Sequence, residues 1–148
     1  MPSRADHIEL AIHDMEVAAH LLLTPAYCDW TATTAFYTAV HVVEAALFPR
    51  HSTDHVTREK ILKNSRYQKI WEHFRPLKNA SEVARYLEDR PGKTMLFKNY
   101  LSSDEVKQTL IMHHLNQIVK SASRLIGSND LATKLRDEFT RTFQPPTN

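Results

Sequence analysis

Glycine and cysteine are both scarce in this 148-residue chain, which has two glycines and the single cysteine Cys28. One cysteine excludes an intrachain disulfide and the paired spacing of a zinc ribbon. The small number of glycines, together with many strong helix formers, favours an all-α domain over a sheet. The length fits one domain with a buried core.

Long apolar runs are also missing. No run of eighteen apolar residues could span a bilayer, and the N-terminus lacks the basic-then-apolar pattern of a signal peptide. We therefore expect a cytoplasmic protein that has no membrane partner. The sequence indicates no cofactor.

The net charge of +2 is unevenly distributed along the chain. Residues 1–48 sum to −5, residues 49–78 to +5 and residues 79–148 to +2. A basic central third of this kind can attract RNA, DNA or an acidic protein. It is equally compatible with an ordinary solvated face, so charge alone assigns no function.

Apolar residues recur every three or four positions along most of the chain, which is typical of amphipathic helices. We expect long helices over residues 4–23, 30–48, 54–75 (interrupted near 64–65) and 103–126, with shorter ones over 80–88 and 129–143. Short connections favour antiparallel neighbours. The sequence thus predicts an up-and-down antiparallel four-helix bundle with extra short helices over residues 1–127. A C-terminal helix and a loose tail are expected over residues 128–148.

The expected boundaries rest on capping and helix-breaking residues. Asp29 is predicted to cap the second helix, Pro76 to end the third, and Gly127 to stop the helix over 103–126. Ser102 and Glu105 form a capping box at the start of that helix. Its predicted core stripe is Ile111, Leu115, Ile118, Ala122 and Leu125.

The helix over residues 30–48 is apolar on more than one side. Such a helix lies in the middle of a bundle or in a dimer interface, so a homodimer is one expectation. Tyr37, His41 and Glu44 lie one above another on it. For His41 a hydrogen-bonded core histidine is favoured over a catalytic one.

The turn after this helix gathers groups that can bind a phosphate or move a proton. Arg50, His51, Asp54, His55 and Arg58 fall within nine positions. Asp54 can cap the next helix, whose N-terminal N–H groups and dipole would add to the arginines as an anion site.

Two histidine patterns in the sequence contain residue types that can bind a metal. Glu9, His13, Glu16 and His20 share one helical face, but the Glu-x-x-His order of di-iron bundles is absent, which favours a polar flank. His113 and His114 would be about 100° apart on an α-helix. We therefore expect them to be boundary histidines that cannot share one metal, and we predict no metal site.

Four sequence stretches resemble proteins of the HEPN family. These are DW at positions 29–30, AFYTAVHVVEAAL in the same helix, HSTDHVTR in the turn, and SEVARY further on. The resemblance covers roughly residues 4–126. It implies an up-and-down helical bundle that commonly dimerises. Active members are metal-independent ribonucleases, often toxins or defence effectors, whose signature is an arginine followed four to six residues later by a histidine.

Arg50 and His55 match that signature, with His51 as the polar residue after the arginine. A histidine can take a proton from a ribose 2′-hydroxyl or protonate the leaving oxygen, while an arginine steadies charge on the phosphate. The predicted site comprises Arg50, His51 and His55 as catalytic residues, Arg58 and Lys60 as phosphate-binding residues, and Tyr37, His41, Asp54, Arg85 and Tyr86 in support.

Three functions follow as alternatives. The first is a protein that binds RNA and acts as a ribonuclease of a toxin–antitoxin or defence system. The second is a non-catalytic homodimer that binds another protein, such as an antitoxin. The third is binding of a nucleotide or another small phosphate ligand.

Overall fold

The computed structural model describes residues 2–50, 52, 54–90 and 92–144, most of them helical. The helices are α1 (Arg4–Leu21), α2 (Cys28–Leu47), α3 (His55–Leu62), α4 (Gln68–Tyr86), α5 (Ser103–Glu105), the π-helix η4 (Val106–Leu115), α6 (Asn116–Ile126) and α7 (Asp130–Phe143). Short 3-10 turns are η1 (Pro25–Tyr27), η2 (Ser65–Tyr67) and η3 (Phe97–Asn99), and β1 (Glu88–Arg90) pairs antiparallel with β2 (Lys93–Thr94). The predicted all-α class is confirmed, with this small hairpin as an addition.

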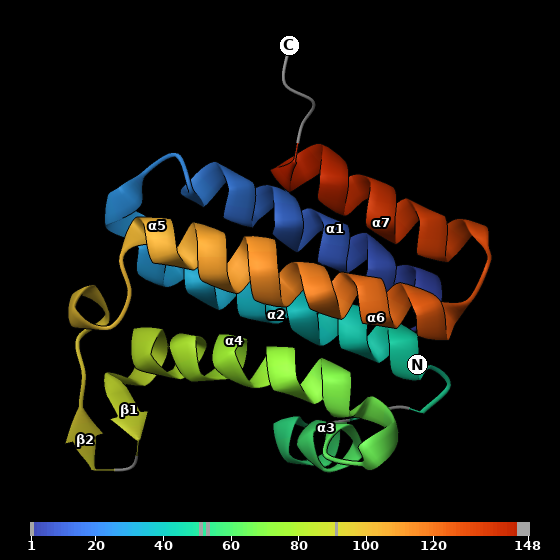
Figure 1. Ribbon diagram of the computed structural model, residues 1–148, viewed down its shortest axis with the longest axis horizontal. Coiled ribbons are helices and arrows are strands. Elements are labelled where there is room, and N and C mark those ends of the chain that lie inside the picture. The colour runs from blue at the N-terminus through green and yellow to red at the C-terminus, as the bar shows by residue number, and fades with distance from the viewer. Residues whose placement is uncertain (1, 51, 53, 91, 145–148) are drawn as a thin grey trace.

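Helix α2 occupies the centre of the molecule (Figure 1). It packs against α1, α4, η4 and α6, all from the same chain. Fourteen of its twenty residues are buried, which explains why its sequence is apolar on several sides. The breadth of this apolar surface is therefore accounted for within one protomer and no longer argues for a dimer.

Helix α4 runs through Pro76 without a break, so the predicted end at Pro76 and the separate helix over 80–88 were wrong. Proline removes one backbone hydrogen bond and crowds the preceding turn. The apolar spacing nevertheless continues in phase beyond it, with Phe74 before the proline and Leu77 and Val83 after it, all buried. Burial of this continuous face offsets the local cost of the proline.

Residues 103–126 are continuously helical, as expected, but ten of them, Val106–Leu115, form the π-helix η4. Ser102 and Glu105 make the predicted capping box at its start. Gly127, at φ 103°, terminates α6 as predicted. The predicted core residues Ile111, Leu115, Ile118 and Ala122 are buried, but at the end of α6 Ile126 is buried in place of Leu125, which is 37% exposed.

The helix starts are set by local hydrogen bonds. Asp54 caps α3 by accepting from the N–H of Thr57 at 2.7 Å, as predicted. Asp29 does not cap α2, because the helix begins one residue earlier, directly after η1. The Asp29 carboxylate instead accepts from the N–H of Trp30, inside the first turn.

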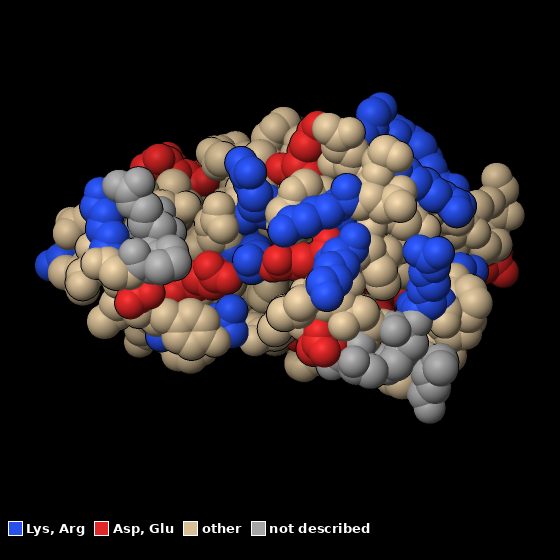
Figure 2. Space-filling view, turned by 90° about the horizontal axis from the view of Figure 1, so that it is seen from below, with Lys and Arg blue, Asp and Glu red and all other residues tan. Residues whose placement is uncertain are grey.

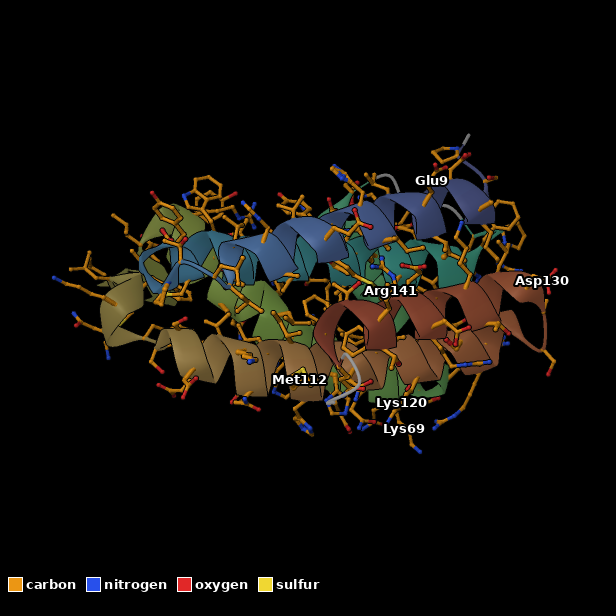
Figure 3. All side chains as sticks on the ribbon, turned by 90° about the horizontal axis from the view of Figure 1, so that it is seen from above. Glu9, Lys69, Met112, Lys120, Asp130 and Arg141 are labelled. Carbon is orange, nitrogen blue, oxygen red and sulfur yellow. The ribbon has the colours of Figure 1, made fainter. Side chains whose placement is uncertain are left out.

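Helix α7 packs on the rest of the same chain. Its buried residues Leu135, Phe139 and Phe143 belong to the common core. Arg141, which is labelled on α7 in Figure 3, lies 3.3 Å from Glu16 of α1. The loose end predicted for the C-terminus falls mainly on residues 145–148, outside the described residues. Nowhere in the described part of the chain is a helix both long and apolar enough to cross a bilayer.

Candidate functional site

A buried ion pair links α2 to α3. Glu44 projects from the apolar helix α2, and its Oε1 accepts a hydrogen bond from Arg58 Nε at 2.8 Å. The hydroxyl of Ser52 donates to the same carboxylate oxygen. All three side chains are buried. This network ties the turn after α2 and the start of α3 to the centre of the bundle.

Arg58 also fixes the orientation of His55. Its Nη1 lies 2.9 Å from His55 Nδ1. A guanidinium can only donate hydrogen bonds, so Nδ1 is the acceptor and a neutral imidazole carries its proton on Nε2. Burial of the inner edge of the ring lowers the pKa of His55, and the nearby charges of Arg58 and Arg85 lower it further. His55 is therefore a neutral hydrogen-bond donor at pH 7.

The ring of Phe36 forms a floor shared by His55 and Arg85. His55 lies with its ring centroid 5.9 Å from that of Phe36, and the Arg85 guanidinium lies 5.7 Å from the same centroid. The two polar groups come from α3 and α4, whereas Phe36 lies on α2. Three helices thus bring an imidazole and a guanidinium into contact with one aromatic ring, and the charge of Arg85 is near enough to lower the pKa of His55.

Arg85 is held by a set of tyrosines. Its Nη1 donates to the hydroxyl of Tyr37 at 3.0 Å and to that of Tyr86 at 3.1 Å, and its Nη2 donates to Ser81 Oγ at 3.2 Å. The guanidinium also lies 4.8 Å from the centroid of the Tyr86 ring, a cation–π distance. The predicted supporting residues Tyr37, Arg85 and Tyr86 therefore meet in space. We call His55, Arg85, Tyr37 and Tyr86 the His55–Arg85 cluster.

His41 faces α1 and contacts His7. The Nδ1 atoms of the two rings are 3.3 Å apart, and one of them must donate to the other. Desolvation lowers the pKa of His41 to about 4, with further lowering from His7 and Arg58 and an opposing effect from Glu44. His41 is thus half-buried and paired with His7.

The remaining predicted residues are placed differently. Arg50 is exposed in the turn after α2, and in the described part of the chain it makes no hydrogen bond or ion pair with His55. His51 lies outside the described residues. Arg58 is turned inward to Glu44, and Lys60 is exposed on α3. The catalytic and phosphate-binding roles of these residues stay predictions.

Charges of both signs alternate on the face formed by α3 and α4. Figure 2 shows Lys and Arg side chains spread across it, with Asp and Glu side chains between them. Lys78 bridges α3 and α4 by contacting Glu59 at 2.6 Å and Glu82 at 3.4 Å. Burial alone would lower the pKa of Lys78, but the two carboxylates outweigh it and raise that pKa. Part of the basic charge counted in residues 49–78 is thus neutralised locally.

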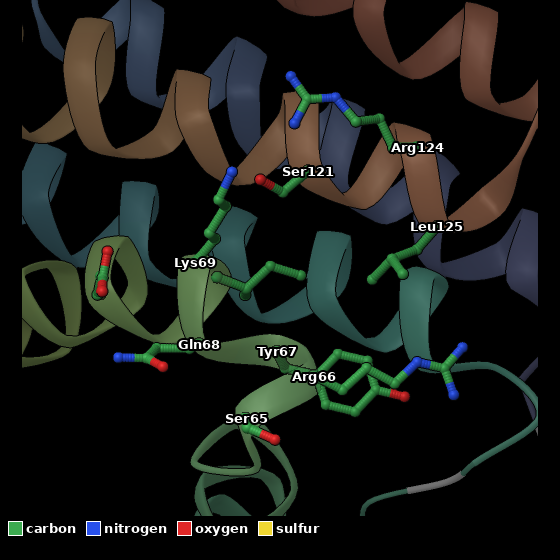
Figure 4. Close-up of a pocket in the computed structure, with 10 residues that line it drawn as sticks. Ser65, Arg66, Tyr67, Gln68, Lys69, Ser121, Arg124 and Leu125 are labelled. Carbon is green, nitrogen blue, oxygen red and sulfur yellow. The ribbon is translucent and has the colours of Figure 1, made fainter.

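A groove of about 610 Å³ separates the N-terminal end of α4 from α6 (Figure 4). Arg66 and Lys69 line one side of it, Ser121 and Arg124 the other, and Glu72 adds one acidic group. The sequence pattern did not indicate this groove, because its two walls are about fifty positions apart in the chain.

A second group missed from the sequence joins His73 of α4 to His113 and His114 of η4. The ring centroids of His113 and His114 are 4.8 Å apart, and His73 Nδ1 lies 3.0 Å from His114 Nδ1. Desolvation lowers the pKa of His73, and it lowers that of His114 to about 4, with neighbouring imidazoles adding to the effect. The expected separation of about 100° between His113 and His114 assumed an α-helix, whereas this segment is a π-helix.

Comparison with known proteins gives no assignment. No protein-family model matches the chain, and neither curated proteins nor solved structures yield a match.

Proposed function

We propose that this chain is a HEPN-like four-helix-bundle protein that binds RNA through the His55–Arg85 cluster. The observation that carries the proposal is that His55 and Arg85, from different helices, lie 5.9 and 5.7 Å from the centroid of the same Phe36 ring. The packing of α1, α4 and the helical segment 103–126 around α2 supports the bundle. The family assignment rests on the sequence motifs described above.

The cluster supplies donors suited to a phosphodiester. The neutral ring of His55 presents Nε2–H, because Nδ1 is occupied by Arg58. Arg85 adds a full positive charge that is already oriented by Tyr37 and Ser81. Hydrogen bonds from charged groups to phosphate oxygens are stronger than neutral ones. Little ordering of Arg85 is needed when the ligand binds, which favours affinity.

Exposed aromatic side chains near this cluster favour single-stranded RNA over a small phosphate ligand. Tyr86 is 61% exposed, and Trp30 on α2 is 60% exposed. Trp30 and Arg85 line the same small pocket. Bases of single strands stack on such rings whatever their sequence, at about 1–3 kcal/mol per base. A phosphate held at Arg85 would leave the adjoining bases within reach of these rings.

Cleavage requires a general base in addition to the groups that bind RNA. In the tautomer fixed by Arg58, His55 Nε2 carries a hydrogen and has no lone pair with which to accept the proton of a 2′-hydroxyl. His55 becomes a general base only if its proton moves to Nδ1 and the contact with Arg58 breaks. Binding is therefore the primary proposal, and metal-independent ribonuclease activity, involving Arg50 and His51 as well, is its extension.

Fluorescence anisotropy with a labelled single-stranded RNA, in EDTA and at several salt concentrations, tests the proposal. Arg85→Gln should weaken binding by about tenfold, since a hydrogen bond to a charged group contributes roughly 1.5 kcal/mol. His55→Ala should weaken it severalfold while leaving the fold intact, because His55 is exposed. Lys134→Gln, which removes one exposed positive charge on α7, is the matched control and should bind within twofold of the unaltered protein.

The same samples, analysed on denaturing gels, separate binding from cleavage. RNA cut by the unaltered protein but not by His55→Ala would support the ribonuclease extension. Binding without cleavage would remove that extension and keep the binding function. If no salt-sensitive RNA binding is seen, the proposal fails.

A homodimeric protein-interaction module is the second candidate. Large apolar side chains remain exposed where α2 begins and α4 ends, namely Tyr27, Trp30, Tyr86, Leu87 and Leu96. Light scattering after gel filtration should give twice the monomer mass if this patch pairs two copies, and Trp30→Glu should restore the monomer. A monomer at high concentration would end this candidate.

A further inference from the structure

Three histidines from α4 and η4 meet at one edge of the molecule. His73, His113 and His114 each offer a ring nitrogen, and these atoms all lie within 4.8 Å of one another. They are the one such group of potential ligands found among the described residues. We propose that His73, His113 and His114 bind a divalent transition-metal ion, with zinc the best fit, and leave one coordination position open to solvent.

The distances between the imidazole nitrogens are close to those between the ligands of a zinc ion. Zinc binds imidazole nitrogen at about 2.0–2.1 Å, so two ligands of a tetrahedral site are roughly 3.4 Å apart. The Nδ1 atoms of His73 and His114 are 3.0 Å apart, already close to that value. His113 is the most exposed of the three, and rotation about its side-chain bonds can shorten a separation of up to 4.8 Å to the roughly 3.4 Å of a tetrahedral site.

The backbone of η4 makes the arrangement possible. In an α-helix, consecutive side chains diverge by about 100°. The i→i+5 bonding of a π-helix puts more residues in each turn, so consecutive side chains diverge less. His113 and His114 thereby have their ring centroids 4.8 Å apart, and each lies with its centroid 5.3 Å from that of His73. π-helical segments are rare and occur frequently at functional sites.

The type of ligand points to the class of ion. An all-imidazole group suits zinc, copper, nickel and cobalt, whereas magnesium and calcium prefer oxygen ligands. Three protein ligands with an open fourth position are typical of zinc sites that bind water or an anion rather than of closed structural sites. Lys69, one helical turn before His73, lines the groove between α4 and α6. Figure 4 shows the Lys69 side chain extending across the groove toward Ser121 of α6. Lys69 therefore adds a positive charge one helical turn from His73.

Titration of tag-free, EDTA-treated protein with Zn²⁺ by calorimetry, and with Co²⁺ by visible absorption, tests the proposal. We expect one ion per chain, a rise in Tm on zinc addition, and the intense visible bands of four-coordinate Co²⁺. His73→Ala and His113→Ala should each lower the affinity at least a hundredfold. His13→Ala removes an exposed histidine from α1 and should change nothing.

Circular dichroism of each variant without metal shows whether the variant has kept its helical fold. His113→Ala is the decisive variant, since its exposed side chain contributes little to the core. A stoichiometry well below one, an octahedral Co²⁺ spectrum, or a zinc affinity unchanged in His113→Ala and His73→Ala would each overturn the proposal. RNA binding through His55 and Arg85 is measured in EDTA, so the two proposals stand or fall separately.

Discussion

Glu44 and Arg58 form an ion pair of 2.8 Å in which the two side chains are only 4% and 8% exposed. The pair joins residues fourteen positions apart and places Arg58 against His55. A buried charge is tolerated only with its partner, so each residue depends on the other. The stability of the turn and the orientation of His55 are therefore coupled.

Removal of one partner should be strongly destabilising. Glu44→Ala leaves Arg58 buried and uncompensated, and we expect it to lower the free energy of unfolding by about 3–5 kcal/mol. Glu9→Ala, on the exposed side of α1, should change it by less than about 0.5 kcal/mol. Urea denaturation measures both. The double variant Glu44→Met/Arg58→Leu should be more stable than Glu44→Ala, and equal loss in the two would contradict this account.

The stability should fall as the pH is lowered from about 6.5 toward 4. Desolvation, with smaller effects from His7 and Arg58, lowers the pKa of His41 to about 4 in the folded state, against 6.5 as its ordinary value. Between these values the unfolded chain binds a proton that the folded chain does not, so unfolding becomes easier as pH falls. We expect the titration of His41 to lower the free energy of unfolding by about 1–2 kcal/mol over this pH range, after allowance for solvent screening.

Urea denaturation of the unaltered protein and of His41→Asn at pH 7 and pH 4.5 isolates this contribution. Other histidines with lowered pKa values titrate in both proteins and cancel in the difference. The pH dependence should be shallower in His41→Asn. Identical pH dependence in the two proteins would show that His41 is not the responsible group.

Pro76→Ala should stabilise the protein. Alanine restores a backbone N–H inside α4 and removes the clash with the preceding turn, while the unfolded chain gains some freedom. We expect a net gain of about 1–2 kcal/mol in the free energy of unfolding. Arg75→Ala, at the exposed neighbouring position, is the control for general helix propensity. If Pro76→Ala is less stable than the unaltered protein, α4 does not run straight through this position as described.

Gly127→Ala should destabilise the end of α6. Gly127 has φ 103° and ψ −171°, a region that side-chain-bearing residues rarely adopt. No atom lies within 4 Å of an added Cβ, so the expected loss of about 1–3 kcal/mol is entirely backbone strain. Thermal denaturation of Gly127→Ala and of the control Ser128→Ala measures this loss of stability. Equal Tm values in the two variants would mean that the turn relaxes without cost.

Several elements could be predicted because their signals are local. The capping box of Ser102 and Glu105, the cap at Asp54 and the stop at Gly127 each act within a few residues. The proximity of His55 and Arg58 could likewise be predicted, because the two residues are one turn apart on α3. The failure at Pro76 has a tertiary cause, because packing of a continuous apolar face overrode the rule that proline ends a helix. At Leu125 the buried position is taken by the next residue of α6, Ile126.

The amino-acid sequence by itself determined the helical class, most helix boundaries and the buried character of α2, because periodicity and capping depend on neighbouring residues. Only the tertiary structure decided which polar groups meet. It paired Glu44 with Arg58, set His55 and Arg85 on Phe36, and brought His73 to His114 across forty-one positions. Such contacts depend on how whole helices pack against one another, and no spacing along a single chain segment encodes that packing.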